Sequence, residues 1–215
     1  MLHYSIEDLD ALPSRERAHF INSCTGYKSA NLLGTVSKDE LTNVAIFSSV
    51  IHLGSNPPLL GFMLRPTTVA RNTYDNLKKT GVFTVNHVNE NIVRAAHQSS
   101  AKYAGEVSEF DEVDLSTEFL DGFEAPYVKE SMIKLGCAFT NEYFIKENEC
   151  LFIIGAIKHI YLDEGIQKKD GWLDLEAAKT VSINGLDGYS LPHLIERLSY
   201  AKPDKELKTI SKDGA

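Results

Sequence analysis

Cysteine is scarce in this chain of 215 residues, which contains only Cys24, Cys137 and Cys150. Their number is odd and they form no C-x-x-C pair, so the sequence does not indicate a disulfide framework. Structural disulfides persist mainly in oxidising compartments. We therefore expect three reduced thiols and a cytoplasmic protein.

Long hydrophobic runs are also missing. The run at 151–157 is one of the longest, and it is far too short to cross a bilayer. The first residues lead directly into polar sequence without the apolar region of a signal peptide. We expect no membrane association.

Positively charged residues are relatively few. The chain has 22 basic and 30 acidic residues, so its formal net charge is −8. A general nucleic-acid binder needs a basic face that displaces counterions, so no nucleic-acid partner is expected. Charge still acts locally where water is excluded, and one basic pocket remains compatible with this composition.

Several catalytic and nucleotide-binding motifs are absent. There is no G-x-x-x-x-G-K-[ST] and no G-x-G-x-x-G, so neither a P-loop nor a Rossmann site is indicated. There is no G-x-S-x-G elbow, and we assign no catalytic dyad. The seven histidines show no metal-ligand spacing, so we predict no metal.

The segments that are present predict one β-rich domain over residues 1–215, most simply a barrel with peripheral helices. Its core lies at about 25–195, between an N-terminal helical segment and a charged C-terminal tail. Alternation and apolar runs predict strands at 29–37, 43–51, 59–65 and 82–88, a hairpin of 131–145 with 150–162, and loops at 99–130. Helices are expected at 1–22 (with an N-cap at Ser14), 73–80 (ended by Gly81), 89–98 and 191–199.

The strand at 43–51 has two contrasting faces, because alternate residues of a strand point the same way. Val44 and Ile46 begin a face that suits a core, whereas the face of Asn43, Ala45 and Phe47 is small or polar with one ring. A flat heteroaromatic ligand could lie along that second face. Taken alone, the pattern equally suits an edge strand with an ordinary polar outer face, which is the commoner arrangement.

The stretch RPTTVARNTYDN at 65–76 concentrates cations and hydroxyls before a helix. Asn72 or Thr73 can cap that helix, and a helix start attracts anions. Arg65 and Arg71 flank the approach, and the planar guanidinium suits phosphate. The alternative is a surface loop whose arginines are solvated or pair with local acids, and the residues alone favour neither.

A third polar cluster lies in AHQSSAKY at 96–103, where His97, Ser99, Ser100 and Lys102 follow a predicted helix. These groups could face a pocket that holds an anionic ligand. A helix end with hydroxyl caps and exposed polar side chains would produce the same pattern.

In combination these segments resemble the flavin reductase-like family of FMN-binding split β-barrels, which includes the flavoredoxins. The resemblance covers about 25–195 and rests on NVAIFSSVIHLGSNPPLL, RPTTVARNTYDNLKKTGVFTVNHV, FIIGAIKHIYL and GLDGYS, in that order. Any one of them alone would be weak. Many members carry a basic-Asp-Thr triplet where this chain has Arg71-Asn72-Thr73, so a capping side chain is kept and a charge is lost.

The resemblance implies a homodimer with FMN near the subunit interface. It places the flavin ring along the first segment and the phosphate at the helix start, with His97, Ser99, Ser100 and Lys102 as further contacts and Tyr189 approaching from the C-terminal side. The residues implied for the ring are Asn43, Ala45, Phe47, Ser48 and Ser49, and those for the phosphate are Arg65, Arg71, Asn72 and Thr73.

The implied activity is that of an oxidoreductase which passes electrons from NAD(P)H through FMN to free flavin or another acceptor. Three alternatives remain open at this stage. The chain could be an FMN electron carrier between protein partners, a non-enzymatic binding protein for a phosphorylated ligand, or an oxidase of the pyridoxamine-phosphate type on a related barrel.

Overall fold

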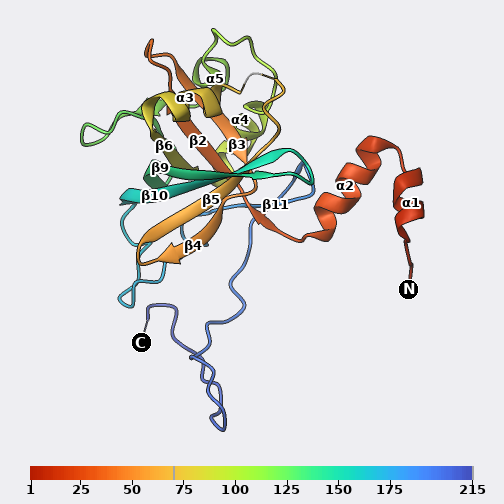
Figure 1. Ribbon diagram of the computed structural model, residues 1–215. Coiled ribbons are helices and arrows are strands. Elements are labelled where there is room, and N and C mark those ends of the chain that lie inside the picture. The colour runs from red at the N-terminus through yellow and green to blue at the C-terminus, as the bar shows by residue number, and fades with distance from the viewer. Residues whose placement is uncertain (70, 215) are drawn as a thin grey trace.

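A computed structural model describes residues 1–69 and 71–214, and its centre is a curled antiparallel sheet (Figure 1). Seven strands follow the spatial order β3-β2-β6-β9-β10-β5-β4. Their bounds are β2 (Asn31–Val36), β3 (Thr42–Phe47), β4 (Ile51–Ser55), β5 (Pro58–Leu64), β6 (Val82–His87), β9 (Ile133–Ile145) and β10 (Cys150–Leu162). The predicted split β-barrel with peripheral helices is confirmed.

The expected strand at 43–51 is two strands, and the chain passes directly from one edge of the curled sheet to the other. β3 and β4 lie at opposite ends of the sheet order, although only residues 48–50 separate them in the chain. At this bend the Ser49 hydroxyl accepts from the Met63 amide at 3.0 Å and donates to the Met63 carbonyl at 3.2 Å. A hydroxyl that bonds backbone groups competes with the regular ladder, which is why the strand breaks here.

Two apolar cores lie on the two faces of the sheet. Leu32 belongs to one core and its neighbour Leu33 to the other, as the alternation of a strand requires. Leu33 packs inside the barrel with Phe62 and Phe83, all fully buried. Leu32 packs with Val44 under a cover of smaller elements, namely α4 (Val93–Gln98), α5 (Glu109–Glu112), β8 (Tyr127–Val128) and β11 (Ser182–Asn184).

Gly34 in β2 is required by a close backbone approach. A Cβ atom added there would lie 2.2 Å from the Pro126 carbonyl oxygen and 2.6 Å from the Thr84 hydroxyl. Neither atom is the free end of a flexible side chain, since the Thr84 hydroxyl itself donates to Pro126 at 2.6 Å. The loop before β8 is therefore seated directly on the sheet at this glycine.

Helices occur at the predicted ranges 1–22, 73–80 and 89–98, but 99–130, predicted as loops, contains α5 and two short strands, and the predicted N-caps differ. α3 (Asn72–Thr80) ends at Gly81, which adopts a left-handed conformation with φ of 75°, as predicted. Ser14 is the first residue of α2 (Ser14–Cys24), and the N-cap is Pro13, so that cap prediction was wrong. The remaining short elements are α1 (Ile6–Ala11), η1 (Glu90–Ile92), β1 (Lys28–Ser29), β7 (Thr117–Glu118) and β12 (Gly188–Ser190).

The helix expected at 191–199 does not form. The segment is extended and pairs with residues further along the chain, since the Ser199 amide donates to Lys208 at 2.8 Å. Its apolar side chains find no core, and Ile195 is 99% exposed. An amphipathic pattern without a surface to pack against does not hold a helix. The segment leaves the barrel as a C-terminal arm (residues 191–214), visible in blue in Figure 1.

Arg197 holds the base of the C-terminal arm against the body. Its guanidinium lies 4.3 Å from the centroid of the Trp172 ring and pairs with Asp170 at 2.5 Å. Over residues 1–69 and 71–214, none of the helices has the length and apolar character needed to cross a membrane.

Candidate functional site

The outer edge of β3 is the first component of the site. Among the described residues, β3 pairs with β2 alone, so every second residue directs its backbone N–H and C=O away from the sheet. The Val44 amide points outward, where it donates to the Glu109 carboxylate at 3.3 Å. Ile46, two residues on, has the same orientation by strand periodicity. Its backbone groups thus offer an edge that a planar ligand with both donors and acceptors can pair with.

α5 covers only the first half of this edge. Thr42 contacts Ser108 at 2.8 Å between their hydroxyls, and Glu109 follows at Val44. Burial raises the pKa of the Glu109 carboxyl above its ordinary 4.5, while the hydrogen bonds from its own amide and that of Val44 partly oppose this. Beyond Val44 the edge continues through Ile46 towards the bend at Ser48.

Asn43 and Thr73 connect the strand to the helix start. Both are buried, and the Asn43 amide lies 3.2 Å from the Thr73 hydroxyl and 3.2 Å from the Thr35 hydroxyl. Both polar atoms of the Asn43 side chain find hydrogen-bond partners in one orientation of the amide. Its nitrogen then donates to Glu109 at 3.1 Å, and its oxygen accepts from both threonines. Asn76 adds a bond to Thr35 at 3.2 Å. The expected ring segment and the expected phosphate segment are therefore held together by one buried polar network.

The start of α3 corrects the predicted cap. Arg71 is the N-cap residue and no side chain of the described chain bonds to the first-turn amides, so neither Asn72 nor Thr73 caps the helix. Asn72 instead donates to the Gly105 carbonyl at 3.4 Å, and Thr73 turns inward to Asn43. The first amides of α3 consequently keep their unused donors.

Arg71 stands at this helix start, and Arg65 follows β5 in the segment that leads to it. Within residues 1–69 and 71–214, no ion pair involves Arg65 or Arg71. Arg65 is exposed, and Arg71 is half-buried with its Nε donating to the Pro66 carbonyl at 3.4 Å. Unpaired guanidinium groups beside free helix amides are suited to bind a phosphate.

The other predicted ring contacts have mixed surroundings. The Phe47 ring lies 5.2 Å from the Phe62 ring in an edge-on arrangement, so it faces the barrel core. The Ser49 hydroxyl is used at Met63, as described above. Ala45 and Ser48 are both half-buried. Ser48 follows Ile46 by two residues, so it continues the outward-facing positions of β3 at the point where the bend begins.

The cluster at 97–102 divides between interior and surface. The Ser99 hydroxyl is buried and donates to the Ala96 carbonyl at 2.8 Å, whereas Ser100 and Lys102 are exposed. His97 is exposed, and its Nδ1 lies 3.0 Å from the Tyr189 hydroxyl. The fold thus joins two predicted site residues that are far apart in sequence, and burial raises the pKa of the Tyr189 phenol.

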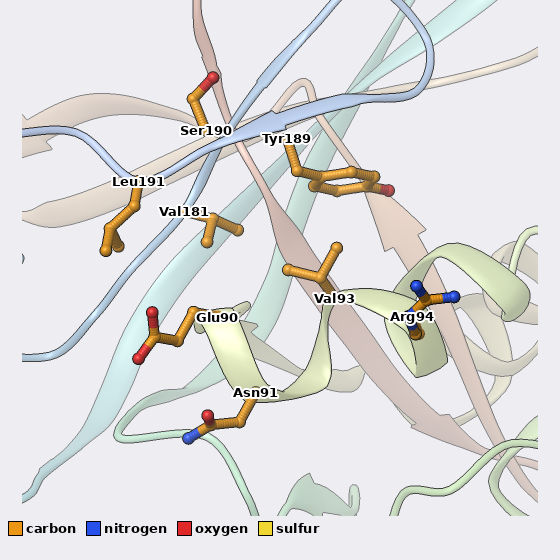
Figure 2. A pocket seen from close by; sticks show the side chains of 8 residues that line it. All are labelled: Glu90, Asn91, Val93, Arg94, Val181, Tyr189, Ser190 and Leu191. Atoms are coloured by element: carbon orange, nitrogen blue, oxygen red, sulfur yellow. The ribbon is translucent and has the colours of Figure 1, made fainter.

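Tyr189 also lines a cavity of about 420 Å³ between η1, α4 and β12 (Figure 2). Sequence reasoning missed this cavity, the outward-facing backbone of Ile46 and the role of Glu109 beside it. No pattern in the local sequence marks them, because each depends on contacts between distant segments.

Comparison with known proteins supplies a family. The model of the "Flavin reductase like domain" family matches residues 25–179. A split-barrel structure from Shewanella frigidimarina NCIMB 400, assigned as a flavin reductase, is 46% identical with a TM-score of 0.91, and the match covers 94% of this chain and 100% of that one.

Two less similar structures share the fold. Nitrilotriacetate monooxygenase component B from Bacillus cereus is 21% identical with a TM-score of 0.80, covering 92% of this chain and 98% of its own. Flavoredoxin of Desulfovibrio vulgaris (Miyazaki F) is 22% identical with a TM-score of 0.69, covering 83% and 92%.

Proposed function

Because the chain belongs to the flavin reductase like domain family, we propose that it is an FMN-dependent oxidoreductase that takes electrons from NAD(P)H and delivers them to free flavin or another acceptor. One observation carries the proposal. β3, whose outer edge is open beyond Val44, is fixed against the uncapped start of α3 by the Asn43–Thr73 contact.

The residues present fit the two ends of FMN. Arg65, Arg71 and the first amides of α3 would hold the phosphate, for which planar guanidinium groups and helix amides are suited. The outward backbone groups of Ile46 and Ser48 would pair with the polar edge of the ring. FMN, when bound, supplies the hydride and electron-transfer chemistry, and the protein supplies position and electrostatics.

The remaining predicted contacts have supporting roles in this proposal. Asn43 and Thr73 are buried, so they position the strand and the helix and contact the cofactor little. His97 orients the Tyr189 phenol, which would approach the ring from the C-terminal side. Ser100 and Lys102 are exposed near the loop that contacts α3, where Lys102 would add positive charge for the phosphate.

We also propose that the active form is a cytoplasmic homodimer. β4 is the second edge of the sheet, and it exposes Ile51 and Leu53 at 51% and 38%. An exposed apolar sheet edge is a surface that proteins normally cover. A second copy of the chain would cover it and would help to enclose a ligand on the open side of the barrel.

A visible absorption spectrum of the purified protein tests the cofactor. We expect flavin bands, or their appearance and a fluorescence change when FMN is added. A colourless protein that binds no added FMN would overturn the proposal. An anaerobic titration with NADH and NADPH then separates the roles, because rapid bleaching of the bound flavin indicates a reductase and very slow bleaching indicates an electron carrier between proteins.

A further inference from the structure

The cavity beside Tyr189 has an apolar floor and an aromatic wall. Val93 of α4 and Val181 before β11 form the floor, and Leu191 closes the side towards the C-terminal arm (Figure 2). The Tyr189 ring lies beside Val93, and its hydroxyl is hydrogen-bonded to His97 Nδ1 at 3.0 Å (Figure 2). A cavity of about 420 Å³ is within the range of pockets that hold small organic molecules.

The cavity also carries one uncompensated positive charge. Glu90 stands at one end, where Lys179 neutralises it in an ion pair. Arg94 stands at the other end, near the Tyr189 ring (Figure 2). Among residues 1–69 and 71–214, no carboxylate is paired with Arg94. The lining combines apolar side chains with polar ones, and it places an aromatic ring beside a free guanidinium. This combination favours a flat molecule that carries a carboxylate.

We propose that this cavity binds a small aromatic carboxylic acid, with Arg94 holding the carboxylate and Tyr189 contacting the ring. The planar fork of arginine can donate two parallel hydrogen bonds to a carboxylate. Stacked or edge-on contact with Tyr189 and burial against Val93 and Val181 would hold the rest of the molecule. The proposal concerns binding alone, and it does not require that the protein carry flavin.

Benzoate and benzamide form a matched pair of probes, since they share size and shape and differ in charge. We would measure their binding to the full-length protein, as purified, by ligand-observed saturation-transfer NMR. Benzoate should bind roughly five- to tenfold more tightly than benzamide, as expected for one partly exposed charge-assisted contact. Equal affinity of the two probes, or no detectable binding of benzoate at millimolar concentrations, would overturn the proposal.

Three variants locate the contact. Arg94→Ala should remove the preference for benzoate, and Arg94→Lys should restore part of it by charge without the planar fork. Lys158→Ala removes the same charge from an exposed position on β10 and should leave both affinities unchanged. Benzoate binding by Arg94→Ala at the wild-type level would contradict the proposal.

Flavin content of the same variants separates this inference from the proposed function. Arg94→Ala should retain FMN at the wild-type level while losing benzoate. Loss of FMN from Arg94→Ala would show that Arg94 belongs to the cofactor site, and a separate acid-binding cavity would then be rejected. Absence of FMN from every form, with benzoate still bound through Arg94, would reject the proposed function alone.

Discussion

The Asn43 amide and the Thr73 hydroxyl lie 3.2 Å apart in the interior, and they join the open edge strand of the barrel to the start of α3. Asn43→Ala would leave the Thr35 and Thr73 hydroxyls without this partner. We expect a loss of about 1–3 kcal/mol in the free energy of unfolding, measured by urea denaturation followed by far-UV circular dichroism. Asn141→Ala, at an exposed position of β9, is the matched control.

That same contact predicts a loss of cofactor affinity, because the helix start would no longer be fixed against the strand. Asn43→Ala should therefore bind FMN more weakly under conditions where it is still folded. Loss of stability without any change in FMN affinity would show that the network supports the barrel alone.

Arg71 offers a direct test of the phosphate end. Arg71→Ala removes a half-buried guanidinium at the uncapped start of α3. We expect the dissociation constant for FMN to rise about 10- to 100-fold, which corresponds to the loss of one charge-assisted interaction. Fluorescence titration with FMN measures it, and Arg15→Ala, at an exposed position on α2, controls for charge. Unchanged affinity would place the phosphate elsewhere.

Glu109 predicts a specific dependence of stability on pH. Burial raises its pKa in the folded protein above 4.5, so the folded state holds this proton more tightly than the unfolded state does. The stabilising contribution of the protonated group is present at low pH and is lost as the pH rises through the raised pKa. The glutamine of Glu109→Gln stays neutral, so this position should lose no stabilising contribution as the pH rises over the same interval.

The comparison requires the free energy of unfolding of both proteins between about pH 4 and pH 8. The wild-type value minus the Glu109→Gln value should fall as the pH rises above 4.5 and then level off. A difference that is constant, or that grows with pH, would contradict the proposed burial of this carboxyl.

Gly34→Ala tests the close approach of the Pro126 carbonyl to β2. A methyl group there would meet backbone at 2.2 Å, so the loop before β8 must move. We expect a loss of about 1–3 kcal/mol or more in the free energy of unfolding, again measured by circular dichroism. Gly105→Ala is the control, because its nearest neighbour would be 4.0 Å away. Equal stability of both variants would refute the packing argument.

The sequence predicted those parts of the fold that local patterns determine. The hairpin of β9 and β10 follows from two long alternating runs, and the end of α3 follows from Gly81. The N-cap of α3 could not be predicted, because Asn72 and Thr73 bond to tertiary partners, Gly105 and Asn43, in place of the helix amides. Capping rules consider only residues that are close in sequence, so they cannot predict competition from tertiary partners.

In the candidate site, too, features set by local sequence could be predicted and features set by tertiary contacts could not. The strand and the helix start were both identifiable from composition and spacing, but the contact of Glu109 with Val44 spans 65 residues and leaves no local pattern. The false helix at 191–199 has the opposite cause. Its apolar residues keep a helical spacing, yet the barrel offers them no surface, and Ile195 remains 99% exposed.

The packing of Arg197 on Trp172 has a practical consequence for every unfolding experiment on this protein. Trp172 is the sole tryptophan of the chain, and the guanidinium at the base of the C-terminal arm lies 4.3 Å from its ring centroid. Its emission therefore reports whether the arm is seated and says little about the barrel. A fluorescence transition that precedes the circular dichroism transition would mark undocking of the last twenty or so residues from a sheet that is still intact.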